Sequence, residues 1–172
     1  MSTLPKPPAE VPVERDLIYC APRLVSAVKL VVADLEAWGY DPLVFETIRT
    51  QERQAFLHGF SRQYDDGRGR VTNSHDADES WHFYGLAVDI VSQSRYWNAP
   101  RDFWRTLGLA AQRHGLRWGA DWDHDGDTGD ERFKDFPHVQ WGPPMRRSPS
   151  AAARRLYDIG GRPRVWREVG AG

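Results

Sequence analysis

The sequence has few of the features that mark disulfide-linked, membrane-spanning or nucleic-acid-binding proteins. Cys20 is the only cysteine, which excludes an intramolecular disulfide and a cysteine-rich metal site. No apolar run approaches the roughly 18 residues that a membrane-spanning helix needs. The formal net charge of −1 provides no general attraction to nucleic acids or anionic membranes. We therefore expect neither a nucleic-acid partner nor a membrane partner.

The N-terminal segment also lacks the apolar stretch of a signal peptide. We expect the protein to be made in the cytoplasm and to leave it only through release by another agent. Residues 1–15 contain four prolines and little that could pack, which predicts an extended arm. Residues 16–172 have the usual size of one domain, and we expect a monomer.

Helical patterns and short strand patterns follow each other without regular alternation. Apolar residues recur every three or four positions over residues 22–38, which predicts an amphipathic helix. Residues 43–46 form a short apolar strand, and Thr50 is a favourable N-cap for a second helix that extends to about Arg62. These elements indicate an α+β fold with a small, mainly antiparallel sheet flanked by helices.

Two further helices are expected in the second half of the chain. Asn98 can cap the first of them, with Pro100 in its first turn. Residues 150–158 favour the second, which Gly160 and Gly161 are expected to end, so that the arginine-rich remainder lies along the surface.

The most informative stretch is Ser80-Trp-His-Phe-Tyr-Gly-Leu-Ala-Val-Asp-Ile-Val-Ser92. From Gly85 it has the period of a strand, which places Gly85, Ala87 and Asp89 on one face. The two small residues leave room next to the carboxylate of Asp89. Because Gly85 allows a bend, the His82 imidazole can turn over the same face. This arrangement indicates a place for a metal ion.

A second strand pattern, Asp135-Phe-Pro-His-Val-Gln-Trp141, places His138 and Gln140 on one face. If it pairs with the strand of Asp89, it completes a set of two imidazoles and one carboxylate. Such a set suits catalytic zinc, since three protein ligands leave a fourth position for water. We therefore expect His82, Asp89 and His138 to bind zinc.

At these residues the sequence resembles a known family. The patterns Ser-x-His-x-x-Gly-x-Ala-x-Asp and Asp-x-Pro-His-x-Gln are similar to those of the peptidoglycan-cleaving M15 zinc peptidases. That family includes D-Ala-D-Ala dipeptidases and carboxypeptidases and the L-alanyl-D-glutamate endopeptidases of phage endolysins. The resemblance extends to residues 45–54 and 115–122, and so covers roughly residues 20 to 142.

The resemblance implies a Hedgehog/DD-peptidase-like fold and a substrate in the peptide stems of peptidoglycan. The segments Phe-Glu-Thr-x-Arg-Thr-x-Glu-Arg-Gln and Gly-Ala-Asp-Trp favour cleavage of the L-alanyl-D-glutamate bond, with D-Ala-D-Ala cleavage as the alternative. An enzyme of this kind acts on the cell wall after release and, if it comes from a phage, passes from the host cytoplasm to the periplasm.

The resemblance also implies roles for residues around the metal. Asp135 occupies the position of the family's catalytic acid, which takes a proton from water and returns one to the leaving amine. Arg49 is expected to stabilise the charged intermediate or to anchor a substrate carboxylate, although an arginine there could also form a surface salt bridge. Ser80 is expected to donate a hydrogen bond near the metal. Three aromatic residues could line a groove or belong to the core: Trp81, Tyr84 and Trp141.

Several features allow other interpretations. Asp121, Asp123 and Asp125 are spaced as in a calcium loop, with Asp127 as a further candidate ligand, but Arg132 stands where a bidentate glutamate belongs.

His75 lies in a long polar loop and is expected to be solvated. Two rival functions remain, a zinc-stabilised binding module without catalysis and a metal-dependent nuclease. Asp135 argues against the module, and the acidic loop argues against the nuclease because it would repel phosphates.

Overall fold

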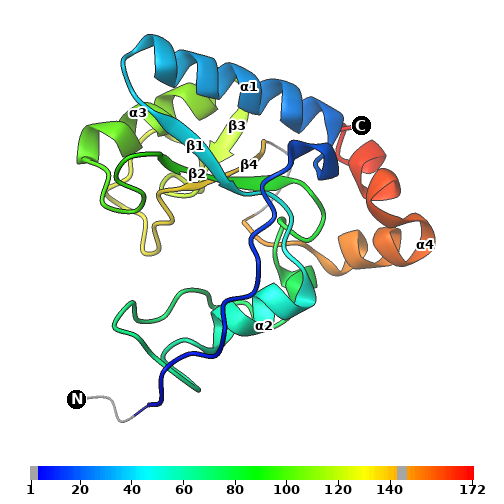
Figure 1. Cartoon of the computed structure of the whole chain (residues 1–172). Coiled ribbons are helices and arrows are strands. Elements are labelled where there is room, and N and C mark those ends of the chain that lie inside the picture. Colours follow the sequence, from blue (N-terminus) through cyan, green and yellow to red (C-terminus); the bar gives the residue numbers. More distant parts are fainter. Residues whose placement is uncertain (1–3, 143–146) are drawn as a thin grey trace.

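The computed structural model describes residues 4–142 and 147–172. A four-stranded antiparallel sheet lies at the centre of the fold (Figure 1). The strand order is β1-β2-β4-β3. The strands are β1 (Pro42–Glu46), β2 (Ala87–Ser92), β3 (Leu116–Trp118) and β4 (His138–Trp141). The α+β class with an antiparallel sheet is confirmed. Strand β3, which pairs with β4 at the sheet edge, was not expected from the sequence.

Helices α1 (Pro22–Ala37) and α3 (Arg101–Arg113) pack against each other on one side of the sheet (Figure 1). The buried apolar positions of α1 recur every three or four residues, as the sequence predicted. The expectation for the start of α3 was wrong. Pro100, and not Asn98, is the N-cap, because the backbone N–H of Asn98 donates to the Arg95 carbonyl in a turn that follows β2.

Helix α2 (Gln51–Gly59) lies apart from α1 and α3, beside the long polar loop (Figure 1). Thr50 caps it as expected, accepting a hydrogen bond from the Arg53 N–H. The helix ends three residues before Arg62, where the ring of Tyr64 packs against Gly59 so closely that a Cβ there would lie 2.3 Å from it. The 3₁₀ turns η1 (Leu17–Tyr19) and η2 (Ala77–Glu79) complete the secondary structure before β2.

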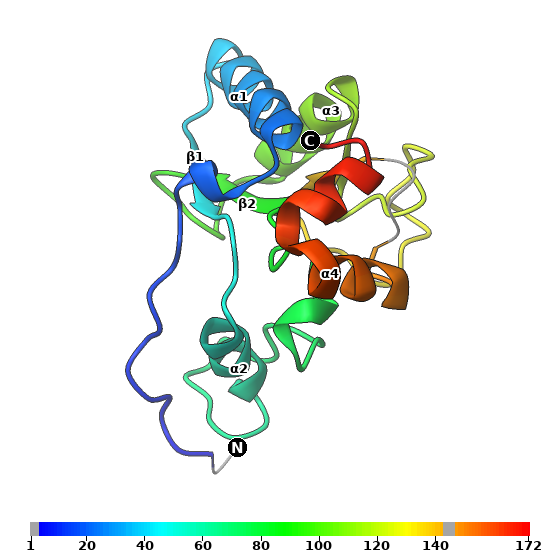
Figure 2. The ribbon, with the colours of Figure 1, turned by 90° about the vertical axis from the view of Figure 1, so that its right-hand side faces the viewer.

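The C-terminal helix α4 (Ala151–Glu168) corrects a prediction (Figure 2). Gly160 and Gly161 have non-helical backbone angles and interrupt the helix, as the sequence predicted, but a second helical part then continues to Glu168. This part was expected to lie along the surface, but it is helical and one side of it is packed: Val165 is fully buried, and Trp166 Nε1 donates to the Tyr84 carbonyl at 2.7 Å. None of the described helices combines the length and low polarity needed to cross a membrane.

The N-terminal segment runs as an extended chain from the region of α2 to α1 (Figure 2). It is held by specific hydrogen bonds: the Thr47 N–H donates to the Glu14 carbonyl at 2.8 Å, and Arg53 Nη1 donates to the Val11 carbonyl at 3.0 Å. The arm is therefore packed against the segment between β1 and α2 and against the first turn of α2.

Candidate metal centre and its pocket

Strands β2 and β4 place a carboxylate and an imidazole opposite each other. In their antiparallel register Asp89 is paired with His138, and Ala87 is paired with Gln140. Directly paired residues project from the same face of a sheet. The structure therefore brings these two side chains together as the sequence predicted, and the small side chain of Ala87 leaves space beside them.

His82 joins them because the chain turns sharply at Gly85. The φ angle of Gly85 is +65°, in the left-handed region that glycine adopts without strain. A Cβ at this position would lie 2.5 Å from the Tyr19 carbonyl oxygen. Glycine is thus required both for the turn and for the close approach of the two chain segments.

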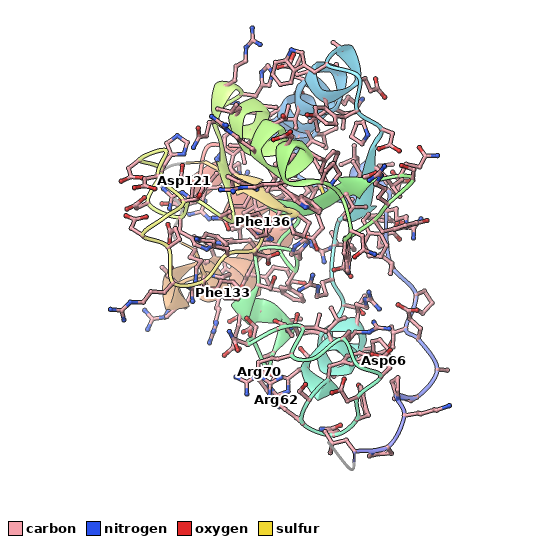
Figure 3. All side chains as sticks on the ribbon, turned by 90° about the vertical axis from the view of Figure 1, so that its left-hand side faces the viewer. Arg62, Asp66, Arg70, Asp121, Phe133 and Phe136 are labelled. Atoms are coloured by element: carbon pink, nitrogen blue, oxygen red, sulfur yellow. The ribbon has the colours of Figure 1, made fainter. Side chains whose placement is uncertain are left out.

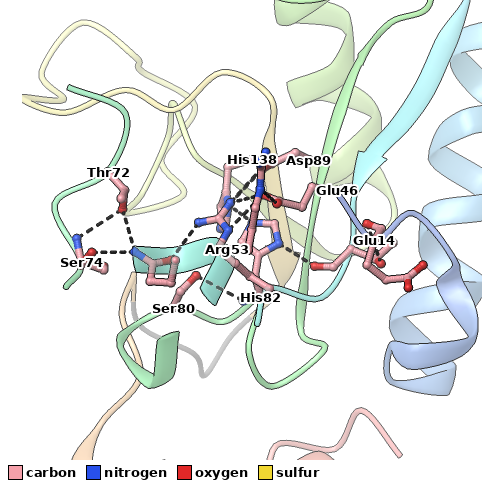
Figure 4. A network of polar contacts seen from close by, with 12 residues as sticks. Glu14, Glu46, Arg53, Thr72, Ser74, Ser80, His82, Asp89 and His138 are labelled. Atoms are coloured by element: carbon pink, nitrogen blue, oxygen red, sulfur yellow. Dashed lines mark hydrogen bonds and ion pairs between the residues drawn. The ribbon is translucent and has the colours of Figure 1, made fainter. Parts of the chain in front are cut away.

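The side chains of His82, Asp89 and His138 each place one possible metal-ligand atom close to a common point (Figure 4). His82 Nε2 lies 3.2 Å from His138 Nδ1 and 3.3 Å from Asp89 Oδ1, and His138 Nδ1 lies 3.5 Å from the same oxygen. Two ligands bound at 2.0–2.1 Å to a tetrahedral ion lie about 3.3 Å apart. The three observed separations agree with this geometry.

The remaining ring nitrogens have acceptors of their own. His82 Nδ1 donates to the Thr47 carbonyl at 2.7 Å, and His138 Nε2 donates to Gln140 Oε1 at 3.1 Å. In the neutral rings these bonds leave lone pairs on the two nitrogens that face Asp89. Asp89 Oδ1 is buried and lies close to both of these nitrogens, but it accepts no hydrogen bond from the part of the chain that the structure describes. Three acceptor atoms that meet in this way suit a cation.

Arg49 lies beside this centre with a side chain only 11% exposed, so it is not a surface salt bridge. Its Nη2 lies 3.4 Å from Asp89 Oδ2, and its Nε and Nη2 both donate to Glu46 Oε2. Arg53 Nε donates to the other oxygen of Glu46 at 3.0 Å. Glu46 is therefore a buried acid between two guanidinium groups. Sequence reasoning missed it, although a glutamate that ends an apolar strand was a visible signal.

These contacts set the charge states of the buried groups. Burial opposes ionisation of Asp89, but the neighbouring His82 and His138 and the charge of Arg49 hold its pKa well below the usual value. Burial also disfavours the charged form of Arg49, but Glu46 and Asp89 raise its pKa further. The carboxylate and the guanidinium both remain charged at neutral pH.

Asp135 borders the same pocket in the turn that leads into β4. The turn is closed by hydrogen bonds from the His138 N–H to the Asp135 carbonyl at 3.1 Å and from the Asp135 N–H to the Gly119 carbonyl at 2.7 Å. Burial raises the pKa of Asp135, and the negative charge of Asp89 adds to this effect against the opposing charge of His138. An acid with a raised pKa in a cleft can both accept and return a proton.

A pocket of about 430 Å³ contains the metal centre together with Arg49, Asp135 and Ser80. The backbone N–H of His82 donates to Ser80 Oγ at 3.4 Å, so the hydroxyl can direct its proton into the pocket.

The aromatic walls of this pocket differ from the expectation. Trp81 lines it, whereas Tyr84 is fully buried in the core and Trp141 Nε1 donates to the Val169 carbonyl at 2.8 Å. Sequence reasoning missed the other aromatic lining residues, which are Phe45, Trp97, Trp104, Trp122, Phe133 and Phe136. Phe133 and Phe136 lie on the same side of the molecule as Asp121 (Figure 3).

The other candidate ligands lie outside the centre. The side chain of His75 is 72% exposed and pairs with Asp76, in agreement with a solvated histidine. Ligand atoms of Asp121, Asp123 and Asp125 lie within 4.8 Å of one another, and that group does not include Asp127.

The buried carboxylate of Asp121 already accepts hydrogen bonds from the backbone N–H groups of Asp125 and Gly126 and from the Gln112 side chain. Both oxygens of this carboxylate thus have hydrogen-bond partners within the protein, and calcium binding stays a prediction.

Comparison with known proteins shows a match to a family model over part of the chain. Residues 73–141, which include His82, Asp89 and His138, match the M15 peptidase family model described as D-alanyl-D-alanine carboxypeptidase. Within this range the chain matches the M15 peptidase family. The matched range contains the strand that carries Asp89 and the strand that carries His138.

Relatives of this chain have named activities. It is 28% identical over 142 residues to the peptidoglycan L-alanyl-D-glutamate endopeptidase CwlK of Bacillus subtilis, covering 76% of this chain and 77% of CwlK. It is 30% identical over 110 residues to the L-alanyl-D-glutamate peptidase of Listeria phage A118, covering 62% of this chain but only 32% of the phage protein.

Among solved structures, the vancomycin-resistance D,D-pentapeptidase VanY, in complex with Zn(II), shares the fold at 20% sequence identity. The TM-score is 0.50, with 79% of this chain and 82% of that chain covered.

Proposed function

We propose that this protein is a zinc-dependent peptidase that cleaves the peptide stem of bacterial peptidoglycan at the L-alanyl-D-glutamate bond. The convergence of His82 Nε2, His138 Nδ1 and Asp89 Oδ1 carries the proposal, because three possible ligand atoms separated by 3.2–3.5 Å suit a cation. One carboxylate and two imidazoles are typical ligands of catalytic zinc. The Zn(II) bound by VanY supports the choice of metal.

A zinc ion bound there would supply an acidified water and polarise the scissile carbonyl. The protein's own residues prepare the ligands for it. Thr47 and Gln140 hold the two imidazoles in the required tautomers, and Arg49 holds Asp89 through Oδ2 so that Oδ1 faces the imidazoles. This network of hydrogen bonds makes the site preorganised.

Asp135 takes the role of general base and then general acid. It borders the pocket, its backbone is tied to that of His138, and burial raises its pKa toward the range in which a carboxylate exchanges protons readily. It accepts the proton of the attacking water and delivers a proton to the leaving amine. A binding module without catalysis would have no use for a buried acid in this position.

Arg49 and Ser80 assist at the carbonyl that is attacked. Arg49 lines the pocket with a permanent positive charge, which stabilises the negative charge that develops on the carbonyl oxygen or anchors a substrate carboxylate. The Ser80 hydroxyl, which lines the same pocket, can donate a hydrogen bond to the substrate.

The relatives support the choice of bond. CwlK and the phage protein are both named for L-alanyl-D-glutamate cleavage, and the match to CwlK extends over most of both chains. The family description and VanY instead support cleavage at D-alanyl-D-alanine, which is therefore the second candidate.

Digestion of purified peptidoglycan followed by mass spectrometry tests both candidates. New C-terminal L-Ala and N-terminal D-Glu would support the proposal, and released D-Ala would support the second candidate. Activity should disappear on chelation, return with zinc, and be absent in His82→Ala but present in the matched exposed-histidine variant His75→Ala. A folded, zinc-loaded protein that produces no new termini would instead be a binding module.

A further inference from the structure

Two aromatic side chains are unusually exposed on the turn that follows β2. Tyr96 is 48% exposed and Trp97 is 53% exposed. Both rings contact Phe45, with centroid distances of 6.3 Å and 4.7 Å respectively. Phe45 directly precedes Glu46, which is paired with Asp89 across the sheet. The exposed aromatic surface therefore begins next to the metal centre, and Phe45 and Trp97 line its pocket.

Polar bonds hold this turn in place. The Asp41 carboxylate accepts hydrogen bonds from Ser92 Oγ at 2.7 Å and from the Ser94 N–H at 2.9 Å. The Tyr96 N–H donates to the Ser92 carbonyl at 2.8 Å. Tyr96 itself has a φ of +49°, which is uncommon for a residue with a bulky side chain. Such strain persists where the surroundings enforce it, and it is frequent at ligand-binding sites.

A second pocket shares the lining residue Phe45 with the first. It has a volume of about 420 Å³, and its other lining residues belong to the N-terminal arm: Glu10, Val11, Pro12, Val13 and Arg15. The Arg15 guanidinium lies 4.9 Å above the Phe45 ring. The arm pocket offers a carboxylate, a guanidinium and backbone groups next to an aromatic wall. A continuous surface thus runs from the metal centre past Phe45 to the arm.

We propose that Phe45, Tyr96, Trp97 and the arm pocket form a saccharide subsite that binds the glycan strand to which the substrate's peptide stem is attached. Sugar rings have an apolar C–H face and a polar edge of hydroxyl and acetamido groups. Exposed aromatic rings beside hydrogen-bonding groups suit this combination, since the ring face attracts the C–H face and the polar groups bind the edge. The inference rests on the proposed function, because it takes the ligand to be peptidoglycan.

The position of the scissile bond determines how far from the metal such a subsite would lie. In peptidoglycan the first stem residue, L-Ala, is attached to the lactyl group of a sugar. For cleavage after L-Ala the glycan begins within about two residue lengths of the reacting carbonyl, roughly 7 Å. For cleavage between two terminal D-Ala residues it begins about four residues away, roughly 14 Å. An aromatic surface that starts beside the metal centre matches the first geometry.

The test compares two substrates in the full-length, zinc-loaded enzyme: a free stem peptide and the same peptide carrying its disaccharide. The wild type should have the higher kcat/KM on the disaccharide peptide. In Trp97→Ala the ratio of the two kcat/KM values should fall about 5- to 10-fold, which is the factor expected for one lost aromatic stacking contact. Trp38→Ala, which removes a 46% exposed tryptophan at the end of α1, should leave the ratio unchanged.

Two further measurements make the result decisive. Tyr96→Gly removes a ring and relieves a left-handed backbone, so it should fold and still lower the ratio. Titration with a peptide-free GlcNAc–MurNAc tetrasaccharide, followed by the tryptophan indole NMR signals, should show binding by the wild type and weaker binding by Trp97→Ala.

The possible outcomes are distinguishable. Tetrasaccharide binding without peptide cleavage would overturn the proposed function and leave the subsite. Cleavage with no tetrasaccharide binding, or equal losses on both peptides in Trp97→Ala, would overturn the subsite.

Discussion

Replacement of Asp135 by Asn separates proton transfer from metal binding. Asn has the same size and shape, and the Asp135 side chain makes no hydrogen bond to any residue within 4–142 or 147–172. The backbone bonds that close its turn, to Gly119 and from His138, do not depend on the carboxylate. The three proposed zinc donors are also left in place. We therefore expect the fold and the metal content to be unchanged.

The loss of activity should be large because an amide cannot accept the proton of the attacking water. General acid–base catalysis is worth about 10²- to 10⁴-fold, which corresponds to about 3–5 kcal/mol of activation free energy. Removal of a negative charge near Asp89 should lower the melting temperature little, by less than about 3 °C. The expected variant is thus folded, zinc-loaded and nearly inactive.

Turnover of a stem peptide, elemental analysis of zinc and thermal unfolding are measured on the same preparation. Asp130→Asn, which neutralises an exposed acid in the acidic loop, serves as the matched control and should retain full turnover. Near-normal turnover in zinc-loaded Asp135→Asn would refute the assignment and direct attention to Glu131, whose Oε1 accepts from the backbone of Trp122 and Asp123. Loss of zinc would instead make Asp135 a ligand.

Three other predictions follow from the contacts around the centre. Gln140→Leu removes the acceptor of His138 Nε2 and should weaken zinc binding about 10- to 100-fold in a chelator competition assay. Unchanged zinc affinity would show that Gln140 is not needed to fix the tautomer of His138. Gly119→Ala would place a Cβ 2.4 Å from the Asp135 carbonyl oxygen and should lower turnover by displacing this turn, whereas full activity would show that the turn can adjust. Burial raises the pKa of the Cys20 thiol from 9.0 to about 12, so it should resist alkylation at pH 8 until the protein unfolds. The thiol loses its proton at a lower pH in the unfolded chain than in the folded protein, so the free energy of unfolding should fall as pH rises from about 9 to 12, by at most about 1.4 kcal/mol per pH unit. Alkylation of the thiol in the native protein at pH 8 would contradict this reasoning.

The sequence alone determined the parts of the site that depend on local pattern. Strand alternation decided which side chains share a face, so Asp89 and His138 could be placed together once their strands were paired. Gly85 signalled the bend that delivers His82, because few other residues adopt its backbone conformation. Helix periodicity and the Thr50 cap likewise act over a few residues and were readable without a fold.

Tertiary structure decided what depends on contacts between distant segments. The chain continues as a second helical part after Gly160 and Gly161, where Val165 is buried and Trp166 bonds to the Tyr84 carbonyl in the turn before β2. Glu46 can be buried only because two arginines, three and seven residues later, fold back onto it. The pocket walls likewise assemble aromatic residues from segments far apart in the chain, such as Phe45, Trp97 and Phe133. No local sequence pattern specifies these contacts between distant segments, since they follow from the packing of the whole domain.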